Sequence, residues 1–354
     1  MAYTTIDDPS AHFQTATYTG NAGALNIVNG GNSDSQPDLV WRKDRGATKS
    51  HRLVDSSRGV QEAIRSNADS AEGTDTGLVT AFNSDGFSHN STDTAWNGSG
   101  DTYVAWQWKA NGGTRTTNTE SGNNPAGGYQ ANTTAGFSIV DYTGTGAAGT
   151  MAHGLGAVPT CMIIKNRGES VDWGVYHQEM SSAGNDSYLE LNTNDATATA
   201  GTMWNDTTPT SSVFTIGSNT KTNKDAIAYI AYVFTPIQGF SKFGSYTGNG
   251  NADGVFVYTG FKPAWVMQKR TNNSTDAHWH IFDVKRNTYN PRNTRLEGNN
   301  NFADSTGEGA DFLSNGFKWR SNDVRYNGSD DTYIYMAFAE HPFVSSEGVP
   351  CTAR

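Results

Sequence analysis

An internal repeat constrains the fold of this 354-residue chain more than any other feature of its sequence. A Tyr-Thr-Gly motif recurs at 18–20, 142–144 and 246–248, each time after an apolar or aromatic stretch. An aspartate that opens a further apolar stretch follows 83, 83 and 85 residues after each tyrosine, at Asp101, Asp225 and Asp331. Because a pattern that recurs at a steady period marks a recurring structural unit, the sequence predicts three copies of one fold.

Shorter recurrences between these anchors align the three copies. A proline precedes a lysine by six residues in every copy, across a short apolar run: Pro37 and Lys43, Pro159 and Lys165, Pro263 and Lys269. An apolar residue stands three positions before an asparagine in every copy: Ile64 and Asn67, Leu189 and Asn192, Leu296 and Asn299. The second copy diverges at one place, because Phe214 lies 11 residues before Asp225, whereas Phe87 and Phe317 lie 14 before their aspartates.

The composition and the spacing of turn residues favour an all-β fold. Strand-like runs of roughly four to eight residues are separated by clusters of Asn, Gly, Ser, Thr and Asp, which is typical of an antiparallel β-sandwich. The strand-like runs that follow Asp101 and Asp331 carry apolar or aromatic residues on both of their faces, as in a central strand of a sheet. Helix formers gather at 59–69, but this stretch matches strand-like runs in the other copies, so we expect a strand or a single turn there.

These patterns divide the chain into three tandem antiparallel β-sandwich units. Unit 1 spans 1–110, unit 2 spans 137–237, and unit 3, with a C-terminal tail, spans 238–354. Residues 111–136 form the longest polar stretch and are predicted to be a linker. Units 2 and 3 meet across a short joint, so unit 1 is expected to be the more mobile one.

Charge and hydropathy exclude several classes of protein. The chain carries 35 acidic and 25 basic residues, a net charge of -10, and the basic residues are scattered, which argues against nucleic-acid binding. The longest apolar run has nine residues, at 226–234, so no membrane insertion is expected. The first residues lack the features of a signal peptide, so none is expected. Cys161 and Cys351 are not expected to form a disulfide, because a strand position and a terminal tail seldom lie close enough.

Candidate metal and catalytic residues are few. His278 and His280 flank Trp279 on a predicted strand and could share a metal ion with Asp276. The other copies lack this set, so a surface pair is the better interpretation, and we expect no metal, no cofactor and no enzymatic activity. Glycan cleavage needs two carboxylates about 5 to 10 Å apart across a groove. The recurrent aspartates are better explained by turns at strand starts.

Other charged residues also recur in a structural pattern. Asp55 with Arg58 and Asp283 with Arg286 are spaced for local ion pairs, and the second copy has His177 and Met180 at these positions. The recurrent lysines, Lys43, Lys165 and Lys269, are expected at a sheet edge or in a charge pair.

Two loop tryptophans are the candidate binding residues. Trp96 lies in the polar loop 88–99 and Trp204 in the polar loop 193–211. An exposed indole can stack on the face of a sugar ring while neighbouring polar groups bind its hydroxyls. The alternative is that each indole folds back and caps the edge of its sandwich.

Several of these runs resemble a domain that occurs in tandem in tail-fibre and other virion proteins of marine and cyanobacterial phages. The runs are Pro37-Asp38-Leu39-Val40-Trp41-Arg42-Lys43-Asp44-Arg45, Arg58-Gly59, Ser84-Asp85-Gly86-Phe87, Asp101-Thr102-Tyr103-Val104-Ala105-Trp106, Ala337-Phe338-Ala339-Glu340, Pro342-Phe343-Val344 and Gly348-Val349-Pro350. The resemblance covers nearly the whole chain. It implies concanavalin-like or jelly-roll-like sandwiches and no catalytic residues.

The resemblance further implies a phage virion structural protein on the particle exterior, namely a tail-fibre or appendage subunit involved in host attachment. A head fibre, a capsid decoration protein, or a lectin or depolymerase that binds surface polysaccharide are the alternatives. The implied partners are other virion proteins and a host surface glycan. A homo-oligomer is also implied, by analogy with the trimers of elongated phage fibres.

Overall fold

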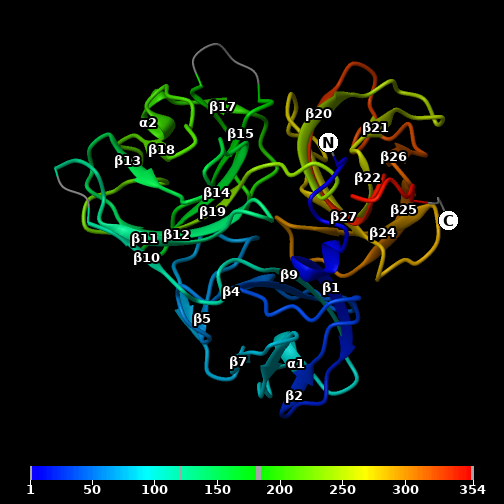
Figure 1. Cartoon of the computed structure of the whole chain (residues 1–354), viewed down its shortest axis with the longest axis horizontal. Helices are drawn as coiled ribbons and strands as arrows, with labels where there is room; N and C mark the ends of the chain where they lie inside the picture. Colours follow the sequence, from blue (N-terminus) through cyan, green and yellow to red (C-terminus); the bar gives the residue numbers. More distant parts are fainter. Residues whose placement is uncertain (1, 120–121, 181–184, 352–354) are drawn as a thin grey trace.

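The computed structural model describes residues 2–119, 122–180 and 185–351 and is an all-β protein of three sandwich units arranged around a common centre (Figure 1). Unit 1 contains a 3-10 helix, Pro9–Ala11, the short helix α1 (Thr94–Asn97), and strands β1 (Phe13–Thr19), β2 (Leu25–Ile27), β3 (Leu39–Asp44), β4 (Arg52–Asp55), β5 (Glu62–Ala63), β6 (Gly73–Thr74), β7 (Ala81–Phe82), β8 (Phe87–His89) and β9 (Thr102–Trp108).

Unit 2 contains the short helix α2 (Gly201–Trp204) and strands β12 (Phe137–Thr143), β13 (Gly149–Ala152), β14 (Cys161–Asn166), β15 (Gly174–His177), β16 (Ser187–Tyr188), β17 (Ala198–Thr199), β18 (Val213–Ile216) and β19 (Ala228–Phe234). Unit 3 contains β20 (Ser241–Thr247), β21 (Phe256–Tyr258), β22 (Phe261–Arg270), β23 (His280–Asp283), β24 (Arg292–Glu297), β25 (Ser305–Leu313), β26 (Gly316–Trp319) and β27 (Thr332–Pro342). Within the described ranges, no helix is long and apolar enough to cross a membrane.

The inner sheet of every unit has the same strand order, which confirms the repeat. The first strand pairs with the last, the last with the Pro-to-Lys strand, and that strand with the next: β1-β9-β3-β4, β12-β19-β14-β15 and β20-β27-β22-β23. The outer layer is also shared, since Ile27 pairs with Phe87, Met151 with Phe214 and Val257 with Phe317. In unit 3 both layers belong to one curled sheet of eight strands.

The recurrent Tyr-Thr-Gly motif closes the first strand against the last. Its tyrosine stacks on a tyrosine of the last strand, with ring centroids 4.8 to 5.2 Å apart, in the pairs Tyr18–Tyr103, Tyr142–Tyr229 and Tyr246–Tyr333. Its glycine N–H donates to the backbone carbonyl two residues before that second tyrosine, at Asp101, Ile227 and Asp331. Ile227 is therefore the counterpart of the two aspartates.

The predicted equivalence of Asp225 with Asp101 and Asp331 is wrong by two residues. The true spacing in unit 2, from Tyr142 to Ile227, is 85 residues, as in unit 3. With this alignment Phe214 lies one residue from the position of Phe87 and Phe317, so the predicted divergence of three residues shrinks to one. The stacked tyrosine defines the strand start, whereas the aspartate is replaceable.

The predicted linker 111–136 is instead part of unit 2. Strands β10 (Thr116–Asn118) and β11 (Gly127–Asn132) extend its inner sheet beyond β12. The segment is also attached to unit 1, because the carboxylate of Asp38 accepts hydrogen bonds from the backbone N–H groups of Ala110, Gly112 and Gly113. The connection between units 1 and 2 is therefore a structured segment and not a free linker.

One hydrophobic core joins the three units. Each unit has its own core between its two layers, and the other faces of the three inner sheets pack together at the centre. Phe13 of unit 1 stacks on Phe338 of unit 3 at 5.0 Å, and Phe338 also contacts Phe234 of unit 2 at 6.0 Å. The expectation of a more mobile unit 1 finds no support in this arrangement, since unit 1 contributes to the same core.

The recurrent asparagines hold the loops by which the units interlock. Their side-chain oxygens accept the backbone N–H of His51, Trp173 and Trp279, in the pairs Asn67–His51, Asn192–Trp173 and Asn299–Trp279. The indole of Trp173 then donates to the carbonyl of Arg65 in unit 1 at 2.9 Å, and that of Trp279 donates to Glu190 in unit 2 at 2.9 Å. The stretch 59–69 contains β5 followed by an isolated bridge at Ile64, so the strand predicted there is confirmed.

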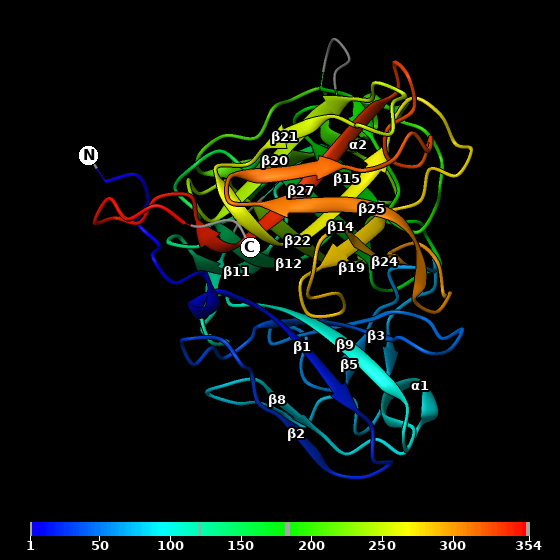
Figure 2. The same cartoon turned by 90° about the vertical axis from the view of Figure 1, so that its right-hand side faces the viewer.

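The two ends of the described chain lie on the same side of the molecule, next to unit 3 (Figure 2). Thr4 donates to the carbonyl of Gln238, and Tyr3 donates to that of Gly260. The backbone N–H of Ser346 donates to Asp7 at 2.6 Å. The first residues of the chain, assigned from the sequence to unit 1, therefore pack against unit 3.

Candidate functional site

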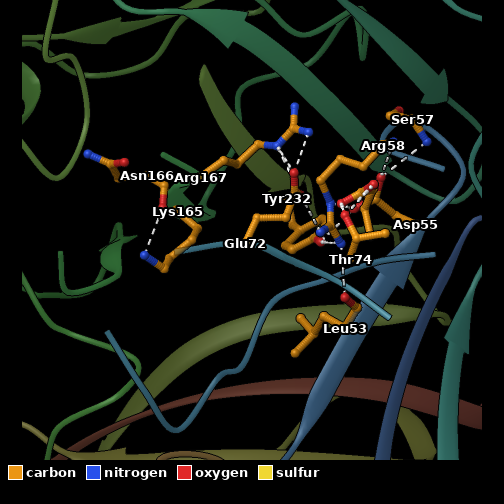
Figure 3. A network of polar contacts seen from close by, with 11 residues as sticks. Leu53, Asp55, Ser57, Arg58, Glu72, Thr74, Lys165, Asn166, Arg167 and Tyr232 are labelled. Carbon is orange, nitrogen blue, oxygen red and sulfur yellow. Dashed lines mark hydrogen bonds and ion pairs between the residues drawn. The ribbon is translucent and has the colours of Figure 1, made fainter. Parts of the chain in front are cut away.

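A buried network of charged side chains holds unit 1 against unit 2 (Figure 3). In unit 1, Arg58 has Nε 2.6 Å from Asp55 and Nη1 2.8 Å from Glu72. From unit 2, the hydroxyl of Tyr232 donates to Asp55 at 2.8 Å, and the guanidinium of Arg167 lies 2.6 Å from Glu72. The predicted Asp55–Arg58 ion pair is confirmed, and it forms part of a junction between units.

The same network recurs where unit 3 meets unit 1. Arg286 has Nε 2.6 Å from Asp283 and Nη1 2.8 Å from Asp304, which confirms the second predicted ion pair. From unit 1, the indole of Trp106 donates to Asp283 at 3.0 Å, and Arg45 lies 2.8 Å from Asp304. Trp106 and Tyr232 occupy the same repeat position, three residues after the stacked tyrosine.

Mutual pairing keeps these buried groups charged. Burial disfavours the ionised form of Asp283, but the guanidinium of Arg286 outweighs it and holds the pKa of Asp283 below its usual value. Burial likewise disfavours the charged form of Arg286, and the carboxylates of Asp283 and Asp304 outweigh it and raise its pKa. Each of these ions is paired with an opposite charge of its own unit, and Trp106 and Arg45 extend the network across the junction.

The third junction, between units 2 and 3, lacks the ion pairs found at the other two. A backbone hydrogen bond identifies the equivalent positions: Glu72 N–H to Arg167 O, Asp304 N–H to Arg45 O, and Thr197 N–H to Thr271 O. Thr197 and Thr271 thus replace an acid and an arginine, and His177 and Met180 replace the Asp–Arg pair. His177 bonds through Nε2 to the carbonyl of Tyr335, 3.2 Å away.

The shorter side chains leave a hollow of about 440 Å³ at this junction. Hydroxyl and amide groups of both units line most of it: Ser187, Thr197, Thr199, Ser245, Thr247, Thr271, Asn272 and Thr332. Thr199, Ser245, Thr247 and Thr332 are exposed to solvent. The hydroxyl oxygen of Thr197 is shielded from solvent and has no hydrogen-bond partner among the residues that the structure describes.

A second hollow continues the first along β20. Glu179, Ser245 and Tyr246 line both. At its far side stand Phe256 and Tyr258 of β21, which are 45% and 47% exposed. We call these two hollows together the junction groove; it is the candidate functional site.

Neither predicted binding tryptophan lies at this site. Trp96 and Trp204 are each 1% exposed and belong to the internal cores of units 1 and 2. The indole of Trp96 donates to Asp75 at 3.0 Å and stacks under the guanidinium of Arg42 at 4.2 Å. The indole of Trp204 donates to the carbonyl of Ser187 at 2.9 Å. The exposed-platform hypothesis is wrong for both indoles, because each completes a sandwich core.

The prediction that the recurrent lysines lie at a sheet edge is wrong. Lys43, Lys165 and Lys269 are buried on β3, β14 and β22, which lie inside their sheets and not at an edge. Their ammonium groups donate to backbone carbonyls: Lys43 to Asp44 and Ala47, Lys165 to Asp69, Asn166 and Val171, and Lys269 to Ala277. Burial lowers the pKa of Lys43 and Lys165 to about 8 and that of Lys269 to about 7.

The histidine pair considered as a metal site does not form a surface pair. His280 is fully buried, with Nδ1 3.7 Å from a carboxylate oxygen of Glu297, while His278 remains partly exposed. Across residues 2–119, 122–180 and 185–351, no three His, Cys, Asp or Glu side chains are grouped closely enough to hold a metal ion.

Two other cavities are each lined by two carboxylates. In one, at the junction of units 1 and 3, Asp8 and Glu340 are present. Burial opposes ionisation of Asp8, but hydrogen bonds from Ser10 and Ser33 outweigh it and lower its pKa, and Glu340 lies 2.7 Å from Lys262. In the other, Asp75 accepts from Trp96 and Asp93 caps α1. A glycosidase needs a carboxyl with a raised pKa as its general acid, and Asp8 does not meet this requirement.

The sequence carried one signal of the groove. The loss of the Asp–Arg pair at His177 and Met180 marks unit 2 as the copy whose junction differs. Thr332, which lies opposite, gives no such signal, because only the packing of units 2 and 3 brings it to the same place.

Searches of the curated proteins and of the solved structures found no match to this chain. One family model, described as a domain of unknown function (DUF7483), matches residues 8–342. The match spans all three units, so the family is defined on the three-unit body and not on a single sandwich. By this match, the chain belongs to the DUF7483 family.

Proposed function

We propose that this protein is a virion structural subunit that is displayed on a phage particle and takes part in host attachment. The resemblance of its repeats to tail-fibre and other virion domains suggests this role. The closed three-unit body carries the proposal, because three sandwiches on one core form a rigid block that can present a surface groove in a constant geometry. Display in many copies then compensates for weak binding at a single groove.

The proposed partners are other virion proteins and further copies of the same chain. Multiple copies on a particle are usually related by closed symmetry. Light scattering of the purified protein tests this part of the proposal: a trimer or another closed oligomer supports it, and a monomer at all concentrations contradicts it.

The main experiment locates the protein and blocks its action. Mass spectrometry of purified particles, from a phage that encodes this chain, should find it, and antibodies against it should label the particle exterior. Pre-incubation of host cells with the purified protein should slow adsorption in a saturable way. Absence of the protein from purified particles would rule the proposal out.

A further inference from the structure

We propose that the junction groove binds an uncharged glycan, with Phe256 and Tyr258 as the stacking platform and the polar side chains between units 2 and 3 as the hydroxyl-binding surface. This inference deepens the proposed function and rests on it only for the biological role of the glycan.

The aromatic platform is formed by alternate residues of one strand. In β21, Val257 points into the core of unit 3, so Phe256 and Tyr258 both project outward on the same face. Exposed large aromatic side chains in one patch cost solvation free energy unless a ligand covers them. Lys242 holds Tyr258 in place, because its ammonium donates to the Tyr258 carbonyl at 2.7 Å and lies 5.3 Å from the ring centroid.

The floor and the far wall of the groove supply groups that bind hydroxyls. Ser245 and Thr247 on β20, Thr332 on β27 and Asn272 line the groove and are exposed residues. The hydroxyl of Thr332 lies 2.7 Å from that of Thr271, and the amide of Asn272 donates to Asp331 at 3.2 Å. Hydroxyl and amide side chains both donate and accept hydrogen bonds, which matches the hydroxyl groups of a sugar. A glycan that runs from the aromatic platform into the junction would meet these groups in succession.

Charge favours an uncharged ligand. Glu179 is the one carboxylate that lines both parts of the groove in the described chain, and Ser245 donates to it at 3.2 Å. Lys242 is the one cationic side chain in the lining of the described groove. Because the protein carries a net charge of -10 and this groove has no cluster of basic residues, a polyanionic glycan would be repelled.

The groove exists because this junction differs from the other two. At the equivalent place between units 1 and 2, Glu72 and Arg167 form an ion pair at 2.6 Å. Thr197 and Thr271 stand at those positions here, and both line the groove. Restoring the charged pair should therefore fill the groove without disturbing the fold.

The experiment measures binding of neutral gluco- and manno-oligosaccharides to the full chain by titration calorimetry and ligand-observed NMR. Phe256→Ala and Tyr258→Ala should each weaken binding by about fivefold, since this factor corresponds to a lost aromatic contact of about 1 kcal/mol. The double variant Thr197→Glu/Thr271→Arg should abolish binding and retain the wild-type melting temperature. Tyr289→Ala, at an aromatic that is 80% exposed outside the groove, is the matched control and should bind as wild type does.

Three outcomes would overturn the inference: no saturable binding of any neutral oligosaccharide, binding of acidic oligosaccharides alone, or wild-type affinity in the groove variants. Circular dichroism of each variant separates loss of binding from loss of folding. The result is also independent of particle location, since a glycan-binding protein that is absent from particles would contradict the proposed function alone. A particle protein without glycan binding would contradict this inference alone.

Discussion

Arg58, Met180 and Arg286 occupy one repeat position and show how a single residue changes the role of a junction. The two arginines are buried within ion-pair networks that join neighbouring units. Met180 is 8% exposed, packs into the central core and leaves no charge at its junction. In units 1 and 3 the residue at this position forms a buried ion pair. In unit 2 the methionine at this position lines the open junction groove.

The buried tryptophans give a prediction at the same scale. Trp96→Ala and Trp204→Ala should each lower the free energy of unfolding by about 3 to 5 kcal/mol, because each removes a large buried side chain and leaves a cavity. Guanidinium denaturation measures this loss. The control Tyr289→Ala should change the free energy of unfolding by less than about 0.5 kcal/mol. Wild-type stability in the tryptophan variants would show that the indoles are not core residues.

Buried histidines predict a loss of stability in mild acid. Burial lowers the pKa of His89 and His177 to about 4, from an ordinary value of 6.5. Between these values the unfolded chain takes up protons that the folded protein does not, so the free energy of unfolding should fall as the pH drops from 6.5 to 4. Each histidine removes on the order of 1 kcal/mol per pH unit.

Urea denaturation across this pH range tests the expectation. His177→Gln should make the fall with pH shallower by the share of one proton, whatever its effect on stability at neutral pH. An identical slope in the variant and the wild type would show that His177 is not protected from protonation.

At the scale of elements, the turn after each first strand depends on a close backbone approach. The Tyr-Thr-Gly glycine passes so near the loop that precedes the last strand that a β-carbon would lie 2.3, 2.2 and 2.1 Å from a carbonyl oxygen of that loop, at Gly20, Gly144 and Gly248. Tyrosine stacking and this contact together set the register of first and last strands. The motif recurs because the same closure is needed three times.

Gly248→Ala should therefore destabilise the protein by about 1 to 3 kcal/mol, since its methyl group cannot be accommodated without a backbone shift. Gly30→Ala is the matched control, because nothing lies within 4 Å of a β-carbon at that position. Thermal unfolding compares the two variants. Equal melting temperatures would mean that the contact at Gly248 is not limiting.

At the scale of the whole molecule, the three sandwiches fold as one body. Their inner sheets share a core, and the contacts between units run in one cyclic direction: unit 1 reaches unit 3 through Trp106, and unit 2 reaches unit 1 through Tyr232. Unit 3 reaches unit 2 through the carbonyl of Tyr335, which bonds His177. Separation of any one unit from the core would therefore expose the apolar inner faces of the other two units to solvent.

At the junction of units 1 and 2, the effects of substituting Asp55 and Arg58 on the free energy of unfolding should not be additive. Arg58→Met should cost about 3 to 5 kcal/mol, because it leaves the carboxylate of Asp55 buried without its ion-pair partner. The double variant Asp55→His/Arg58→Met, which copies His177 and Met180 of unit 2, should be more stable than Arg58→Met alone. Calorimetry should show one unfolding transition for every variant. Separate transitions would contradict a shared core. A double variant less stable than the single one would contradict the coupling between Asp55 and Arg58.

The sequence by itself determined the three copies, the all-β class and most of the strand positions. Tyr-Thr-Gly turns, Pro-to-Lys strands and the Asn contacts depend on local turn chemistry and on the two-residue period of a strand. The alignment of the second copy at Asp225 failed because the aspartate is replaceable, while the stacked Tyr229 is what positions the strand.

The tertiary structure alone decided what faces water. Lys165, Trp96 and His280 are charged or lie in a polar sequence context, but each is buried because residues from other parts of the chain surround it. The junction groove lies between segments about 50 to 150 residues apart, so no local pattern reveals it. Local sequence sets which residues can form a sheet, whereas burial depends on which surface packs against that sheet, and that is a property of the assembled chain.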